Sequence, residues 1–395
     1  MWHPVGTAPH GVLEKHDEPL NSRQESKIKM TMRILHFYNQ QNDLQTRYIS
    51  LLLETMAGSV VVKAYNTLAD IKKELDILRY DILHIHGCWS VQYAKAATYA
   101  KRKGVRVIIS PHGELEPWIL RDRQWQEKMP KTILYQRQTI QEAYVVIAMG
   151  TMERESLEKL GWNPRIETIR NAIITQSITI REMTQQLLAT YRKVMDSDVY
   201  QLMNDDTRKA LFLLLKAAVS EHPNWLHGES VPALNSDEWR QILIYAKHEE
   251  IEHLLKRGIH VLGMKEPMTD VSQVNAYFPA NYTPVKSIAE TIGNKFVSEN
   301  KRLLATFKYL HRLCTSQQLA MAHIMELAKE IRGHDIDEEQ LQETLEEERL
   351  LTFASRLMGV LENFGQMEEG IMPVPSVNDK QTEKLGSQIT NRLKI

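Results

Sequence analysis

The sequence predicts an α/β protein in which a Rossmann-like parallel-sheet domain is followed by a mainly α-helical domain. Two patterns indicate this: short β-branched runs alternate with amphipathic stretches up to about residue 174, and strand-like runs are missing after residue 179. The 395 residues are 43% apolar and 25% charged, enough for a sizeable core and for two or three domains. This composition excludes collagen-like, low-complexity and wholly disordered chains.

Apolar runs of four to six residues mark the strands of the first domain. Each run is apolar almost throughout, as expected of a strand covered on both faces. The runs alternate with amphipathic helical stretches, which predicts βαβ units with right-handed crossovers and a parallel sheet. The predicted strands are residues 33–37, 59–63, 81–86, 105–110, 144–148 and 166–169.

The rest of the chain has a different texture. We expect residues 1–31 to be a mobile polar arm without an apolar signal-peptide core, 32–179 to be the Rossmann-like domain, 180–365 the helical domain and 366–395 a polar tail. Stretches rich in Leu, Met, Glu, Lys and Gln favour long helices. These helices are predicted at 180–220, 237–258, 284–332 and 337–365, and the acidic run 337–348 is expected to be a solvated helix face.

Charge and cysteine content narrow the range of partners. The 49 Lys and Arg residues nearly cancel the 50 Asp and Glu residues, so no overall field favours nucleic acid. Cys88 and Cys314 lack metal-like spacing, which indicates a reducing, cytoplasmic location. His248 and His253 are five residues apart, about 140° around a helix, so we expect no metal site there or elsewhere.

Ligands of open parallel sheets bind beyond the carboxyl ends of the strands, so the residues that follow each strand are the candidates. After the first strand, the amides of Asn39 and Gln40 could bond to sugar hydroxyls, or they form an ordinary polar loop. The glycine-rich turn of a dinucleotide site is missing there.

The third strand ends in a histidine pair. His84 and His86 share one face by strand alternation, and Gly87 permits a tight exit or a close ligand approach. We expect His84 to be structural, whereas for His86 a structural role and a substrate-binding role stay equally open.

The fourth strand is followed by a second group of candidates. His112 stands between a proline and Gly113 at the predicted rim, where an imidazole can donate a hydrogen bond, transfer a proton or stabilise charge. Glu114 follows, and Trp118 offers a flat apolar face that suits a sugar ring. This pattern favours a functional His112.

Residues 95–137 are locally basic, with ten positive and four negative side chains. Such a segment could contact anionic lipid head groups at the inner membrane face or a phosphate-bearing acceptor, or it is ordinary surface charge.

Several of these motifs together resemble a known family. The stretch Asp81–Gly87 (DILHIHG), then Ile109–Gly113 (ISPHG) with Pro117 and Trp118, is similar to the amino-terminal, acceptor-side domain of family-four glycosyltransferases of the GT-B fold. The similarity continues in order through Val146–Met149 and Ile169–Ala172, and covers about residues 32–175.

The resemblance implies half of a GT-B fold and a retaining glycosyltransferase. Such an enzyme moves a sugar from a nucleotide-sugar to a saccharide or lipid-linked acceptor in cell-surface polysaccharide synthesis. The nucleotide-sugar is the donor substrate, and we expect no cofactor. By motif, His112 would stabilise the reacting sugar or the donor phosphate. Gly113 would lie in the same cleft loop, and Asn171 would mark the hinge to a second domain.

The chain also departs from the family. Residues 180–395 do not resemble the second Rossmann domain, and Glu330 and Glu338 share only the spacing of the family's donor-site glutamates, which we interpret as chance. Two alternatives therefore stay open. One is a non-catalytic acceptor-binding or scaffold protein that lacks a donor domain and engages a partner transferase through its helices. The other is an interaction protein centred on the helical bundle.

Overall fold

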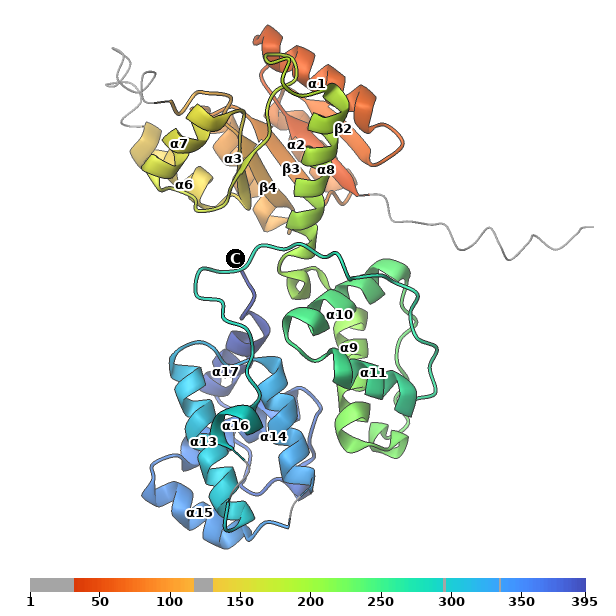
Figure 1. The fold of residues 1–395 in the computed structure, drawn as a ribbon, viewed down its shortest axis with the longest axis vertical. Helices are drawn as coiled ribbons and strands as arrows, with labels where there is room; N and C mark the ends of the chain where they lie inside the picture. Colours follow the sequence, from red (N-terminus) through yellow and green to blue (C-terminus); the bar gives the residue numbers. More distant parts are fainter. Residues whose placement is uncertain (1–31, 117–130, 294–295, 334) are drawn as a thin grey trace, which may run out of the picture.

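The computed structural model describes residues 32–116, 131–293, 296–333 and 335–395. A sheet flanked by helices forms one end of the described chain, and a group of helices forms the other (Figure 1). The predicted arm at residues 1–31 lies outside the described residues.

All strands of the first half join one parallel sheet in the order β2-β1-β3-β4-β5-β6, which confirms the predicted fold class. The second strand begins two residues later than predicted, because the Met56 carbonyl accepts the N–H groups of Ser59 and Val60 in a turn. The strands are β1 (Arg33–Phe37), β2 (Val61–Tyr65), β3 (Ile82–His86), β4 (Arg106–Ser110), β5 (Val145–Ala148) and β6 (Ile166–Thr168).

This order creates a switch point between β1 and β3. The chain passes from β1 outward to β2, then returns to place β3 on the other side of β1. Crossovers that leave in opposite directions open a crevice at the carboxyl ends of such strands, where ligands of doubly wound sheets bind.

Helices cover both faces of the sheet. One core contains Ile34, Ile82 and Ile108 of the strands and is covered by the first and last helices of this half. The opposite core contains Leu35 and Leu83 and is covered by the other four. The helices are α1 (Asp43–Met56), α2 (Leu68–Ile77), α3 (Val91–Arg102), α6 (Arg137–Gln141), α7 (Thr151–Leu160) and α8 (Ile180–Asp196).

Helix α8 follows the expected domain boundary at residue 179 but lies against the sheet. Leu187, Tyr191 and Val194 are fully buried in the same core as the β1 and β3 side chains. Thr179 caps the helix in a capping box with Glu182. The sheet half is therefore completed by a helix that sequence analysis assigned to the second half.

The second half is helical, as predicted, but its helices are shorter. Turns divide the long predicted helices at Glu250 and Arg349, which both adopt a left-handed φ of 58°. The next N–H then bonds back to a carbonyl of the preceding helix, as in a Schellman motif. The helices are α9 (Asp205–Ser220), α10 (Ser236–His248), α11 (Glu252–Val261), α12 (Ile288–Ile292), α13 (Glu299–Thr315), α14 (Met321–Gly333), α15 (Glu338–Glu347), α16 (Leu351–Asn363) and α17 (Lys380–Thr390).

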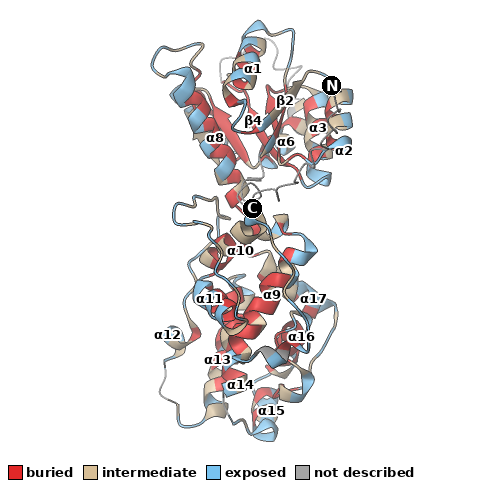
Figure 2. Ribbon diagram, turned by 90° about the vertical axis from the view of Figure 1, so that its right-hand side faces the viewer, coloured by how far each residue is buried: buried red, intermediate tan, exposed pale blue. Residues whose placement is uncertain are grey.

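The prediction that residues 366–395 form a polar tail is wrong. This segment contains α17, which lies beside α16 in the helical half (Figure 2). Leu385 and Ile389 lie on one face of α17 and join the core of the helical half together with Leu393. The spacing of four residues places these side chains on one stripe. The acidic side chains of α15 are exposed, as predicted. No described helix has the length and apolar character that crossing a membrane requires.

Candidate functional site

Four histidines gather where β1, β3 and β4 end. His36 of β1 stands opposite His84 of β3, and His86 stands opposite Ser110 of β4. Because side chains alternate along a strand, all of these side chains lie on the face that α1 and α8 cover. His112 follows β4 directly. The cluster therefore lies at the switch point of the sheet.

Three of the histidines form a chain of hydrogen bonds. Nδ1 of His36 lies 2.8 Å from Nε2 of His86, and Nδ1 of His86 lies 3.0 Å from Nε2 of His112. His36 and His86 are fully buried, whereas His112 is partly exposed and forms the outer end. The chain thus leads from the core of the sheet to its rim.

His84 is bonded outside this chain. Its Nδ1 lies 2.7 Å from the Tyr191 hydroxyl, and its Nε2 lies 2.8 Å from Oγ of Ser110. Both ring nitrogens of His84 are therefore used inside the protein. Tyr191 comes from α8, so this helix completes the buried polar cluster.

Burial keeps the four rings neutral. It lowers the pKa of His36 to about 3 and that of His112 to about 4. Burial also lowers the pKa values of His84 and His86 well below the ordinary range, and the neighbouring histidines lower them further. A neutral imidazole has one donor and one acceptor, so His112 offers hydrogen bonding rather than positive charge at neutral pH.

The loop that carries His112 is fixed by a buried carboxylate. His112 and Gly113 adopt left-handed φ angles of 54° and 82°. The Gly113 N–H donates to Oε1 of Glu153 at 2.6 Å, and the Met149 N–H donates to Oε2 at 2.6 Å. Glu153, near the start of α7, thereby joins the loops after β4 and β5. The sequence alone gives no signal that Glu153 belongs to the site.

Glu114 holds the neighbouring loop. Its Oε2 accepts the N–H of Cys88 at 2.6 Å, and its carbonyl accepts the indole N–H of Trp89 at 2.9 Å. A Cβ on Gly87 would lie 3.2 Å from both Oε1 of Glu114 and the Tyr93 ring, and the φ of Gly87 is 111°. The glycine is therefore required for this close approach.

The amides after β1 lie at the same rim. Asn39 and Gln40 are exposed, and the Asn39 N–H donates to Oε1 of buried Gln45 at 3.2 Å. The other end of the Gln45 amide lies against Gly87. Gln45, which sequence analysis did not single out, thus links the loops after β1 and β3.

Two other predicted site residues stand apart from this group. Asn171 is buried, and its Oδ1 accepts the N–H of Ile173 at 2.9 Å. Its Nδ2 has no hydrogen-bond partner in the described part of the chain. Trp118 lies outside the described residues.

His36, His84 and His86 are the described residues that could converge on a metal ion, with one nitrogen of each within 4.8 Å of the others. Five of their six ring nitrogens already take part in hydrogen bonds of 2.7–3.0 Å. These bonds account for the cluster as a hydrogen-bonded network.

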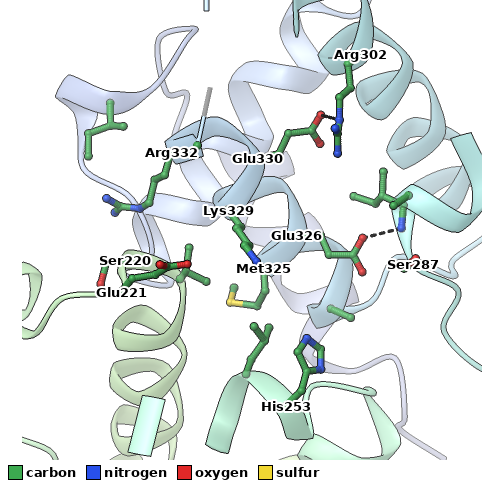
Figure 3. A pocket seen from close by; sticks show the side chains of 17 residues that line it. Ser220, Glu221, His253, Ser287, Arg302, Met325, Glu326, Lys329, Glu330 and Arg332 are labelled. Carbon is green, nitrogen blue, oxygen red and sulfur yellow. Dashed lines mark hydrogen bonds and ion pairs between the residues drawn. The ribbon is translucent and has the colours of Figure 1, made fainter. Parts of the chain in front are cut away.

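A concavity with a volume of about 960 Å³ lies in the helical half, away from the histidine cluster (Figure 3). Arg302 pairs with Glu330 on its wall at 2.9 Å, and Glu326 accepts the N–H of Ile288 at 2.6 Å. Lys329 and His253 also line it. None of the predicted site residues belongs to this cavity.

Comparison with known family models agrees with the fold of the α/β half. Residues 55–177 match the model of the Glycosyltransferase Family 4 domain. The matched region contains His84, His86, His112 and Asn171. No curated protein matches the chain. The α/β half thus resembles the amino-terminal domain of GT-B glycosyltransferases, and the protein is glycosyltransferase-like.

Proposed function

We propose that this protein is a retaining glycosyltransferase that transfers a sugar from a nucleotide-sugar to a saccharide or lipid-linked acceptor, within cell-surface polysaccharide synthesis. One observation carries the proposal: a neutral, partly exposed His112 stands at the carboxyl-end rim of a sheet whose strands β2 to β6 lie in the region that matches the family model. The acceptor sugar would lie over the loops after β1, β3 and β4.

The rim offers the groups that this chemistry needs. His112 can donate a hydrogen bond to an oxygen of the reacting sugar or of the donor phosphate, and such fixed donors stabilise the charge that develops in the transition state. The exposed amides of Asn39 and Gln40 can both donate to and accept from sugar hydroxyls. A Cβ on Gly113 would meet no atom of the described residues within 4 Å, so these residues leave room for a ligand at this point of the loop.

The first test is calorimetric titration of the folded protein with UDP, GDP and their common sugar conjugates. Dissociation constants on the order of micromolar would support the proposal and justify transfer assays. If the folded protein binds none of these nucleotides or sugar conjugates, the proposal is contradicted.

In those assays, His112→Ala should lower the transfer rate about 100-fold or more, because one transition-state donor is lost. The protein should still fold, since His112 is partly exposed, but it should lose some stability because the hydrogen bond between His112 and His86 is removed. His260→Ala, at an exposed position on α11, is the matched control and should transfer normally. Equal rates in both variants would remove His112 from the mechanism.

A second candidate is a non-catalytic acceptor-binding protein that engages a partner transferase. It is favoured by the packing of the second half, where residues from Val199 to Leu393 share one helical core. Binding of oligosaccharides without any affinity for nucleotides would select this candidate over the transferase.

Membrane contact through residues 95–137 also stays a proposal. Lys101 and Lys103 form ion pairs with Glu142 and Asp76, and Arg106 is buried against backbone carbonyls, so these three cations are engaged within the protein. Flotation with vesicles containing anionic lipid would test the rest of the segment. Binding only to neutral vesicles, or to none, would refute an electrostatic contact.

A further inference from the structure

We propose that His36 and His86 are positioning residues that fix the tautomer of His112, holding its proton on Nδ1 and leaving Nε2 as the acceptor. This inference rests on the proposed function only in giving His112 a ligand to face. The hydrogen bonds that fix the tautomer are present in the free protein.

The two bonds of the chain are coupled through His86. A neutral imidazole carries one proton, so His86 can donate through only one of its nitrogens and must accept through the other. Two arrangements satisfy both bonds. In the outward arrangement, His36 donates to His86 and His86 donates to His112. In the inward arrangement, His112 donates to His86 and His86 donates to His36.

The inner end of the chain decides between them. Nε2 of His36 is buried and has no hydrogen-bond partner among the described residues. The inward arrangement would place the His36 proton on this atom, creating a buried N–H without an acceptor. The outward arrangement leaves only a lone pair there. Orphaned buried N–H groups are rarer in proteins than under-used acceptors, so the outward arrangement is favoured.

The surroundings do not offer His86 an alternative. The nearest ring, His84, lies 4.1 Å from His86 between centroids, but its own nitrogens are bonded to Tyr191 and Ser110. The Tyr191 and Ser110 hydroxyls can each donate or accept, so the hydrogen bonds of His84 favour neither the outward nor the inward arrangement. Protonation of the hydrogen-bonded histidines is also opposed, since burial lowers the pKa of His36 and of His112 at the two ends of the series.

The consequence falls on the outer ring. With Nε2 accepting from His86, the only proton of His112 is on Nδ1, for which the described part of the chain provides no acceptor. His112 therefore meets a ligand as a hydrogen-bond donor, matched to a hydroxyl, ring or phosphate oxygen. It cannot serve as a base through that nitrogen.

The test is a long-range proton–nitrogen correlation spectrum of the full chain, labelled with ¹⁵N-histidine and recorded near neutral pH without ligand. His112→Gln identifies the signals of His112 by their disappearance. In the wild-type protein, we expect Nδ1 of His112 to be protonated and Nε2 to be unprotonated. The opposite pattern would overturn the proposal, and this measurement needs no variant of the buried rings.

A pair of variants tests the link through His86. His86→Phe keeps an aromatic ring but removes the donor, so His112 should shift toward the Nε2–H tautomer that free histidine prefers. Tyr191→Phe removes one buried hydrogen bond from the same cluster outside the chain, and should leave His112 unchanged. An unchanged tautomer in folded His86→Phe would refute the positioning role.

Two further outcomes separate this inference from others. Purification with one equivalent of zinc held by these rings would overturn it, because a metal-bound nitrogen cannot take part in the chain. The expected tautomer in a protein that binds no nucleotide would leave the inference standing while the proposed transferase fails. Transfer activity with the opposite tautomer would do the reverse.

Discussion

The neutral histidine cluster makes the sheet half sensitive to acid, and His112→Gln should relieve part of that sensitivity. Burial holds the pKa of His112 at about 4 in the folded protein, while an unfolded histidine titrates at about 6.5. As pH falls from 6.5 toward 4, His112 becomes protonated in the unfolded protein but stays neutral in the folded protein. Stability is therefore fully present above about pH 7 and is lost through this window.

The magnitude follows from the two pKa values. Between pH 7 and pH 5, one histidine with a folded pKa of about 4 lowers the free energy of unfolding by about 2 kcal/mol. His36, with a folded pKa of about 3, adds a similar amount. Together they remove about 4 kcal/mol from a total that is typically about 5–15 kcal/mol.

Native-state hydrogen exchange of the β3 amides, corrected for the intrinsic pH dependence, measures this loss in the sheet half alone. His112→Gln should lose about 2 kcal/mol less than the wild-type protein between pH 7 and pH 5. Tyr191→Phe should lower stability by the same amount at both pH values, because it removes a hydrogen bond of neutral groups. Parallel pH curves for wild type and His112→Gln would refute the reasoning.

Three other residues give independent predictions. Burial raises the pKa of Asp198 to about 6, so the folded protein loses stability as pH rises from about 4 to 6. In urea titrations, Asp198→Asn should raise the free energy of unfolding by up to about 3 kcal/mol at pH 7 and should leave it unchanged at pH 4. In Gly258→Ala, the new Cβ would overlap the Leu214 carbonyl of α9, so thermal unfolding should show a free energy of unfolding about 3 kcal/mol lower. An unchanged Tm would contradict this packing. Arg392→Ala leaves the buried Glu249 carboxylate without its partner cation, so the free energy of unfolding should fall by about 3–5 kcal/mol. Adding Glu249→Gln to the same protein should restore part of this loss. If it restores none, the broken ion pair is not the cause.

The fold was predictable because its signals are local. Runs such as residues 82–86 and 106–110 are buried throughout, so strands covered on both faces read directly from the sequence. The helix breaks at Glu250 and Arg349 were not predictable, because a left-handed residue that ends a helix is usually glycine and here is charged. Each long predicted helix therefore covers two or three helices that the structure separates.

The site was predictable only at its rim. His86 and His112 stand where strands end, which is a positional signal available from the sequence. His36 lies inside β1 between buried Leu35 and Phe37, and only the register of β1 with β3 brings it to His84. Tyr191 joins from α8, beyond the expected domain boundary, so its contact depends on packing that no local pattern encodes.

The distribution of polarity on this face of the sheet supports a ligand at the carboxyl ends. On β1 and β3, the side chains on this face change from Ile34 and Ile82 near the start to histidines near the end. On β4, Ile108 gives way to Ser110. Apolar residues at these buried positions would make the protein more stable, because they would not be protonated in acid and would bury no polar ring. The polar residues are confined to the end of the sheet where the crevice opens, and local departures from the most stable choice are expected at functional sites. A buried network that merely completed the core would have no reason to follow the strand direction in three adjacent strands.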